Sequence, residues 1–152
     1  MLSDNLNSKK YKTIFIASDH AGLEMKNHLI GRFPFLPWKD LGTFTTESVD
    51  YPDYAAKLGE ALKSQLSDSC GVLICGTGQG MAIRANRFSF VRAALCWTSE
   101  VAKLARQHNN ANVLCLAGRL TSFPLNEDIL KTFLETEFEG GRHKGRVDKL
   151  NC

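Results

Sequence analysis

Residues 70–86 read CGVLICGTGQGMAIRAN, and this segment carries the clearest structural signal in the chain. The apolar run 72–74 ends at Cys75 and is followed at once by the glycine-rich segment 76–80, after which helix-forming residues resume. This order predicts a buried strand, a glycine loop and a helix N-terminus. Glycines let several backbone N–H groups turn toward one point, and a helix N-terminus adds positive charge, so we expect the loop to bind an anion.

The glycine loop does not match two familiar nucleotide-binding patterns. The sequence GTGQGM is neither GxxxxGK[ST] nor GxGxxG, and it follows a middle strand instead of the first one, which disfavours a P-loop or a dinucleotide site. The alternative is a purely structural role, a tight turn that needs glycine only for steric reasons. Because one or two glycines would suffice for such a turn, three in five residues favour an anion or an oxyanion as the ligand.

Cys75 stands at the end of the predicted strand, directly before the glycine loop. A helix N-terminus stabilises a thiolate, so this thiol is a candidate base or nucleophile, although most free cysteines simply pack in a core. We expect Cys70, Cys96 and Cys115 to be core residues. The five cysteines, which also include Cys152, are odd in number and form no CxxC pair, which favours reduced thiols in the cytoplasm over disulfides or a zinc site.

The composition indicates one soluble domain. A chain of 152 residues with 43% hydrophobic and 23% charged residues fits a single core, and no apolar run reaches the roughly 18 residues of a membrane span. We expect a polar leader at residues 1–12 and one catalytic domain at residues 13–152. The net charge of +3 arises entirely from residues 140–152, so extended nucleic-acid binding is disfavoured, and a basic C-terminal tail that binds a small anion explains the charge better.

Apolar runs and helical patterns alternate along the chain, which predicts a parallel sheet covered on both faces. Pro52 suits a first helical turn whose buried face extends to Leu66, and Ser99 is the expected N-cap of a later helix. The expected strands are 13–17, 36–41, 70–75, 93–96 and 113–117, and the expected helices follow Gly22, Pro52, the glycine loop and Ser99, with a last one from about Asn126 to about Phe138.

Ligands of parallel α/β sheets bind at the carboxyl ends of the strands. This rule places three groups of residues at one edge of the sheet, which we call the rim. They are Asp19 and His20 after the first strand, Cys75 and its loop after the third, and Arg119 after the fifth. Asp19 and His20 could instead serve only as a helix-capping pair.

Two further groups of polar residues are candidates. His108 lies on the apolar face of its expected helix, where a core histidine is the commoner outcome, but the polar cluster 107–110 around it favours a functional role. Arg142 and Arg146 could belong to a solvated charged tail, as most charge runs do. Their interleaving with glycine in GRHKGR instead suits a segment that wraps an anion.

Six motifs occur in order along the chain: SDHAG, DYPDYA, CGTGQG, RQHNNANVL, AGR and EGGRHKGR. Together they closely resemble the type B ribose-5-phosphate isomerase family, which also includes galactose-6-phosphate isomerase subunits. The resemblance implies an α/β fold, a Rossmann-like three-layer α/β/α arrangement with about five parallel strands. It also implies interconversion of ribose 5-phosphate and ribulose 5-phosphate with no metal and no cofactor. It further implies a homodimer, or a dimer of dimers, with active sites at the subunit interface.

The resemblance also assigns roles to residues. Cys75 would be the base that moves a proton between C1 and C2, and His108, assisted by Asn109, would donate the proton that opens the sugar ring. Asp19 and His20 would contact sugar hydroxyls. The enediolate oxygen would be held by Gly76, Thr77, Gly78, Gln79 and Gly80. The phosphate would be held by Arg119, Arg142 and Arg146.

Two other functions stay open from the sequence. The same chemistry could act on a hexose 6-phosphate such as allose or galactose 6-phosphate, with residues 44–51 setting the chain length. The chain could also be a non-catalytic module that binds a phosphosugar.

Overall fold

The computed structural model describes residue 6 and residues 10–151. Most of the expected leader, residues 1–5 and 7–9, and Cys152 lie outside the described residues. The described strands are β1 (Thr13–Ser18), β2 (Trp38–Asp40), β3 (Ser69–Cys75), β4 (Ala93–Leu95) and β5 (Val113–Ala117). The described helices are α1 (Leu23–Arg32), α2 (Tyr51–Leu62), α3 (Gln79–Ala85), α4 (Ser99–Asn109), α5 (Phe123–Glu135) and α6 (Arg142–Asp148).

The strands form one parallel sheet in the order β2-β1-β3-β5-β4. β3 lies at its centre, and every residue of β3 is buried, as the unbroken apolar run predicts for a strand covered on both faces. The register pairs Gly71 with Val113 and Cys75 with Ala117, so β3 and β5 end at the same edge. The expected parallel five-stranded sheet is confirmed.

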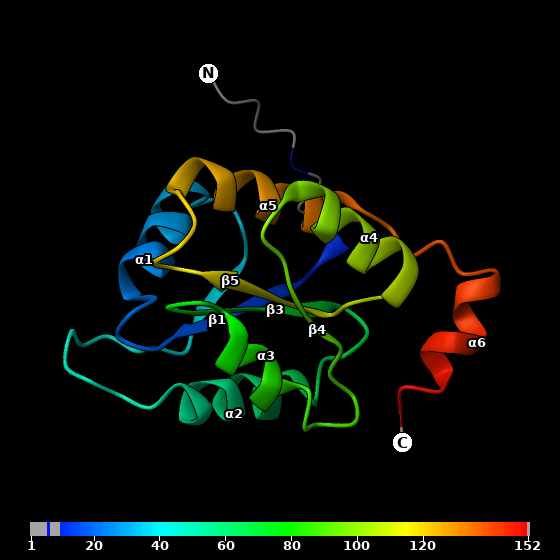
Figure 1. Ribbon diagram of the computed structural model, residues 1–152, viewed down its shortest axis with the longest axis horizontal. Coiled ribbons are helices and arrows are strands. Elements are labelled where there is room, and N and C mark those ends of the chain that lie inside the picture. Colours follow the sequence, from blue (N-terminus) through cyan, green and yellow to red (C-terminus); the bar gives the residue numbers. More distant parts are fainter. Residues whose placement is uncertain (1–5, 7–9, 152) are drawn as a thin grey trace.

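Helices cover both faces of the sheet and complete a three-layer fold (Figure 1). α1, α4 and α5 pack on one face through a core that also includes Leu6. α2 and α3 pack on the other face. Figure 1 shows α6 outside these layers, beside the end of α4. No helix among the described residues is long and apolar enough to cross a membrane.

Four expected helix boundaries, in α2, α4 and α5, were wrong. α2 ends at Leu62, and Leu66 is exposed instead of lying on its buried face. The N-cap of α4 is Thr98, not Ser99, because the Thr98 hydroxyl accepts from the N–H of Val101 at 3.2 Å.

α5 begins at Phe123, three residues before the expected start. Ser122 caps it by accepting from the N–H of Leu125, and Pro124 occupies its first turn, where a missing N–H costs nothing. The helix ends at Glu135, because Thr136 has extended backbone angles, so Phe138 lies beyond it.

Candidate functional site

The glycine loop holds Cys75 at the carboxyl end of β3. Cys75 is 5% exposed, and its Sγ accepts a hydrogen bond from the N–H of Gly78 at 3.2 Å. Gly78 has φ +77°, and a Cβ there would lie 2.5 Å from Cδ1 of Leu95. Both facts require glycine at this position. The loop therefore directs a backbone N–H at a sulfur atom, an arrangement that stabilises negative charge on that sulfur.

Thr77 and Gln79 complete the turn into α3. The Thr77 side chain is exposed, and its Oγ1 accepts from the N–H of Gln79 at 3.3 Å. The hydroxyl hydrogen of Thr77 stays available to donate to a ligand. Gly80 packs against Tyr51 so closely that a Cβ would lie 2.6 Å from the ring. This contact joins the loop to the start of α2, and the loop is thus held between two helices.

Asp19 stabilises the turn between β1 and α1. Its Oδ1 accepts from the N–H groups of Ala21 and Gly22, both at 3.0 Å. The N-cap of α1 is Gly22, with no side-chain cap bond, so the expectation that Asp19 could cap the helix was wrong. Its second carboxylate oxygen, Oδ2, makes no hydrogen bond to a described residue. His20 lies next to it, and its Nδ1 accepts from the N–H of Val49 at 3.1 Å, which ties the loop after β2 to the rim. This bond orients the His20 ring and leaves its Nε2 for another partner.

Arg119 lies beside the glycine loop, as the rim predicts. Its N–H donates to the carbonyl of Gly76 at 3.1 Å, and a Cβ on Gly76 would lie 3.7 Å from both Arg119 Cδ and Ala21 Cβ. The loops after β1, β3 and β5 therefore meet at one place. The expected grouping of Asp19, His20, the Cys75 loop and Arg119 on one rim is confirmed.

The other predicted residues lie at the opposite edge of the sheet. α4 runs back from the carboxyl end of β4 to the start of β5, so His108 and Asn109 lie near the amino ends of the strands. The five residues of β5 alone separate the two edges by about 13 Å, given a strand rise of about 3.3 Å per residue. In Figure 1 the strands point to the left, whereas α6 and the end of α4 lie at the right. Within one chain, Cys75 and His108 do not belong to the same site.

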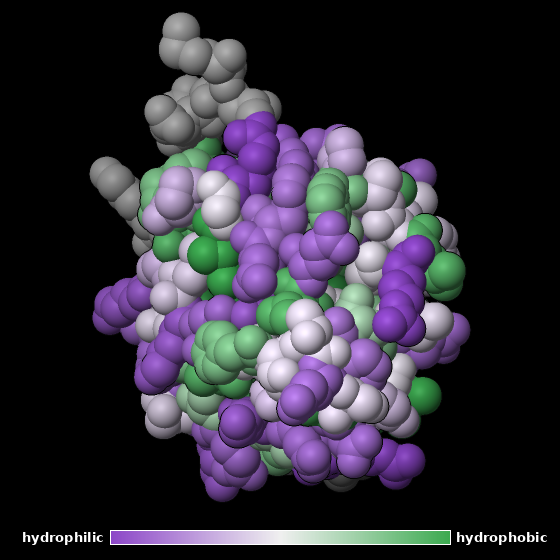
Figure 2. Space-filling view, turned by 90° about the vertical axis from the view of Figure 1, so that its left-hand side faces the viewer, coloured by the Kyte–Doolittle hydropathy of each residue, from purple (hydrophilic) through white to green (hydrophobic). Residues whose placement is uncertain are grey.

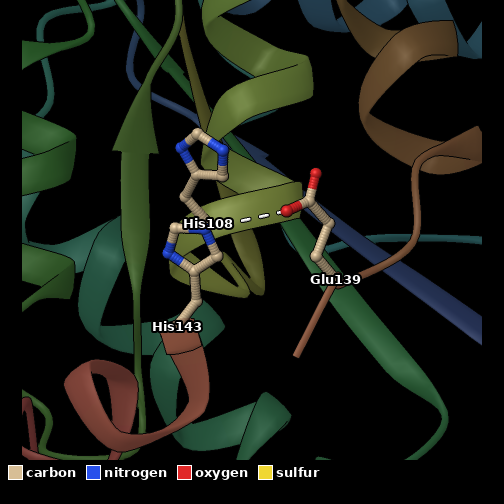
Figure 3. Close-up of side chains that lie close together, drawn as sticks. All are labelled: His108, Glu139 and His143. Carbon is tan, nitrogen blue, oxygen red and sulfur yellow. Dashed lines mark ion pairs between the residues drawn. The ribbon is translucent and has the colours of Figure 1, made fainter. Parts of the chain in front are cut away.

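His108 contacts the C-terminal helix directly. Its ring stacks on the ring of His143 with centroids 4.3 Å apart and planes 16° apart (Figure 3). Beside them is a cavity of about 280 Å³, lined by His108, Asn109, His143, Arg146, Val147 and Leu150. Arg142 is exposed on the first turn of α6. We call His108, Asn109, Arg142, His143 and Arg146 the second group. It offers two imidazole rings, an amide and two guanidinium groups to an anionic ligand.

His143 is a residue of this group that sequence reasoning missed, although it lies inside the GRHKGR motif. Burial lowers its pKa, and the neighbouring His108 and Arg142 lower it further, while Glu139 acts in the opposite direction. A lowered histidine pKa favours the neutral imidazole. The only sequence signal was its position between two arginines already chosen for their charge.

The carboxyl edge also exposes large apolar side chains. Three of them follow strands: Phe44 after β2, Trp97 after β4 and Leu120 after β5 are 74%, 59% and 75% exposed. Figure 2 faces this edge and shows hydrophobic residues exposed between hydrophilic ones. Apolar side chains gathered around a polar rim are typical of a surface that another protein covers.

The chain is similar in sequence to known proteins. The family model described as Ribose/Galactose Isomerase matches residues 14–150. Ribose-5-phosphate isomerase B of Escherichia coli (strain K12) is 37% identical over 143 residues, which cover 93% of this chain and 95% of that protein.

Solved structures are similar over nearly the whole chain. A ribose 5-phosphate isomerase from Thermotoga maritima is 48% identical, with a TM-score of 0.88 and coverage of 91% of this chain and 97% of its own. Ribose-5-phosphate isomerase B from Mycoplasma genitalium, solved with bound ribulose-5-phosphate, is 42% identical, with a TM-score of 0.88 and coverage of 91% and 93%.

Proposed function

The chain belongs to the ribose/galactose isomerase family and is an aldose–ketose isomerase, and we propose that it interconverts ribose 5-phosphate and ribulose 5-phosphate with Cys75 as the proton-transfer base. The observation that carries this proposal is the Cys75 thiol at the carboxyl edge, with the Gly78 N–H directed at its sulfur. The glycine loop beside this thiol supplies donors for the enediolate oxygen, and the second group supplies ring opening and phosphate binding.

The other described cysteines offer no comparable base. Burial raises the pKa of Cys70 and of Cys96 to about 12, and it raises the pKa of Cys115 well above its usual value. These thiols stay protonated at neutral pH and have no hydrogen-bond donors of a loop around them. Cys75 alone among the described cysteines stands beside the glycine loop, whose Gly78 N–H points at its sulfur.

Proton abstraction next to a carbonyl needs a stabilised oxyanion. When Cys75 removes a proton from C2 of the open aldose, negative charge develops on the O1 oxygen of the enediolate. N–H groups of the loop 76–80 and the Thr77 hydroxyl lie beside the base and can donate to that oxygen. One such donor stabilises a transition state by about 3 kcal/mol. A proton then moves from O2 to O1, and return of the carbon-bound proton to C1 gives the ketose.

Ring opening and phosphate binding are assigned to the second group. His108 would protonate the ring oxygen, assisted by Asn109, while Arg142 and Arg146 would bind the phosphate. Because this group lies at the far edge of its own chain, we propose a homodimer in which each Cys75 works with His108 of the partner subunit. The exposed apolar side chains around the rim support this arrangement, since a partner would cover them.

The test is isomerisation of ribose 5-phosphate by the purified protein, with Cys75→Ser as the critical variant. Serine is a far weaker acid than cysteine, so we expect the rate to fall about 100-fold or more. His108→Ala should slow the reaction of the cyclic sugar more than that of an acyclic substrate. A Cys75→Ser protein as active as the unchanged protein would refute the assignment of the base.

A further inference from the structure

Three potential metal ligands meet beside the second group. His108 comes from α4, His143 from α6, and Glu139 from the segment between α5 and α6 (Figure 3). One ligand atom of each residue lies within 4.8 Å of the other two. The N–H of Glu139 donates to the carbonyl of Gln107 at 3.1 Å, so the backbone of this segment is attached to the end of α4. The cluster is therefore held together by three parts of the chain.

The His143 ring brings an unsatisfied nitrogen into this cluster. Its side chain is only 8% exposed, and its Nε2 has no hydrogen-bond partner among the described residues. The closest charged atom is Oε2 of Glu139 at 3.7 Å, which is beyond hydrogen-bond distance. A buried polar atom without a partner is costly, and it calls for a ligand or an explanation.

We propose that His108, Glu139 and His143 bind one Zn²⁺ ion per chain. Two imidazole nitrogens and one carboxylate oxygen are a common ligand set for zinc, which leaves a fourth position for water. Ligand atoms at about 2.0–2.1 Å from a tetrahedral zinc lie about 3.4 Å apart. The three atoms lie within 4.8 Å of one another, so no pair has to approach by more than about 1.4 Å. The half-exposed Glu139 side chain can move, and the stacked rings must tilt toward the ion.

The surrounding charges set the strength of this site. Arg142 and Arg146 lie close enough to His143 to affect its charge, and they oppose a bound dication. Glu139 provides the compensating negative charge. We therefore expect a dissociation constant for zinc in the micromolar range. This corresponds to a binding free energy of about −8 kcal/mol at a 1 M standard state. The site is an inhibitory one, not a cofactor site.

The inhibitory effect rests on the proposed function of His108. A zinc ion on the ring nitrogen of His108 removes the group that would protonate the sugar oxygen. It also lies beside the cavity that Arg146 lines, so zinc and the sugar phosphate compete for one place. Zinc is thus expected to inhibit the isomerase competitively with ribose 5-phosphate.

Zinc binding is tested without substrate, by titrating the purified protein against a chromophoric chelator. Glu139→Gln and His143→Gln should each weaken binding more than tenfold, because each removes one ligand. The matched control is His28→Gln, since His28 also pairs with a glutamate, Nε2 to Glu127 Oε1 at 2.7 Å, away from this cluster. Cys75→Ser controls for binding at the thiol. Circular dichroism checks that each variant is folded.

Two results decide between the outcomes. One zinc per chain, weakened in both cluster variants and unchanged in His28→Gln and Cys75→Ser, supports the site. Zinc affinity that is unchanged in Glu139→Gln, or that is lost in Cys75→Ser, overturns it.

The activity measurement separates this proposal from the proposed function. Glu139→Gln should keep its isomerase activity and lose inhibition by micromolar zinc. An active Glu139→Gln protein that zinc still inhibits as strongly overturns the inhibitory role. A protein with no isomerase activity refutes the proposed function, while the zinc titration still decides whether the site exists.

Discussion

Subunit complementation tests the division of the site between two chains. The perturbation is a pair of single variants, Cys75→Ser and His108→Ala, each placed in a chain with its own affinity tag. The two residues lie at opposite edges of the sheet, so each chain would contribute Cys75 to one site and His108 to the other. Co-expression and two successive affinity steps isolate the mixed dimer.

The expected activity follows from counting sites. In a mixed dimer, one site combines both substitutions, and the other combines an unchanged Cys75 with an unchanged His108. The mixed dimer should therefore recover about half of the unchanged dimer's kcat, because a two-fold symmetric dimer has two equivalent sites. Each single-variant homodimer has two damaged sites and should lose about 100-fold or more in the conversion of ribose 5-phosphate.

The assay is ribulose 5-phosphate formation per dimer, with the unchanged dimer carrying both tags as control. If Cys75 and His108 acted within one chain, each site of the mixed dimer would keep one substitution. Activity as low as in the single-variant homodimers would then refute the shared site. An unchanged protein that is fully active and runs as a monomer at assay concentration would refute the dimer itself.

Three other predictions follow from single contacts. Gly78→Ala should lower the free energy of unfolding by about 1–3 kcal/mol and abolish most activity, because it places a Cβ at φ +77° and 2.5 Å from Leu95. Urea unfolding and the isomerase assay measure these two effects. Arg146→Ala should raise KM more than it lowers kcat, since phosphate is bound in ground and transition states alike, and an unchanged KM would contradict its role. Asp40→Ala should destabilise the fold by about 3–5 kcal/mol, because it leaves the fully buried Lys26 ammonium without the carboxylate 2.6 Å away. Lys26→Met should be nearly neutral, and thermal unfolding of both variants checks this.

Local sequence predicted most of the architecture. The unbroken apolar runs identified the strands, because a strand buried on both faces needs apolar side chains on both sides. Helix ends were less predictable, since several neighbouring residues can cap a helix. Thr98 and Ser99 are both good caps, and only the backbone shows that the Thr98 hydroxyl faces the free N–H of Val101.

The C-terminal tail shows where local patterns fail. Residues 142–148 form α6, although glycine and a run of basic residues gave no helical signal. The helix is stabilised by packing, because His143 and Val147 are buried against the molecule. Such contacts depend on residues more than thirty positions away in the chain, as in the stack on His108.

The sequence by itself determined the parallel sheet, the glycine loop and the rim that joins Asp19, His20, Cys75 and Arg119. These features follow from short-range patterns and from the rule that parallel strands end at one edge. Only the tertiary structure decided that His108 and the tail arginines lie at the opposite edge. The reason is that α4 must return the chain across the sheet before β5 can pair in parallel, so residues at its end are carried away from Cys75.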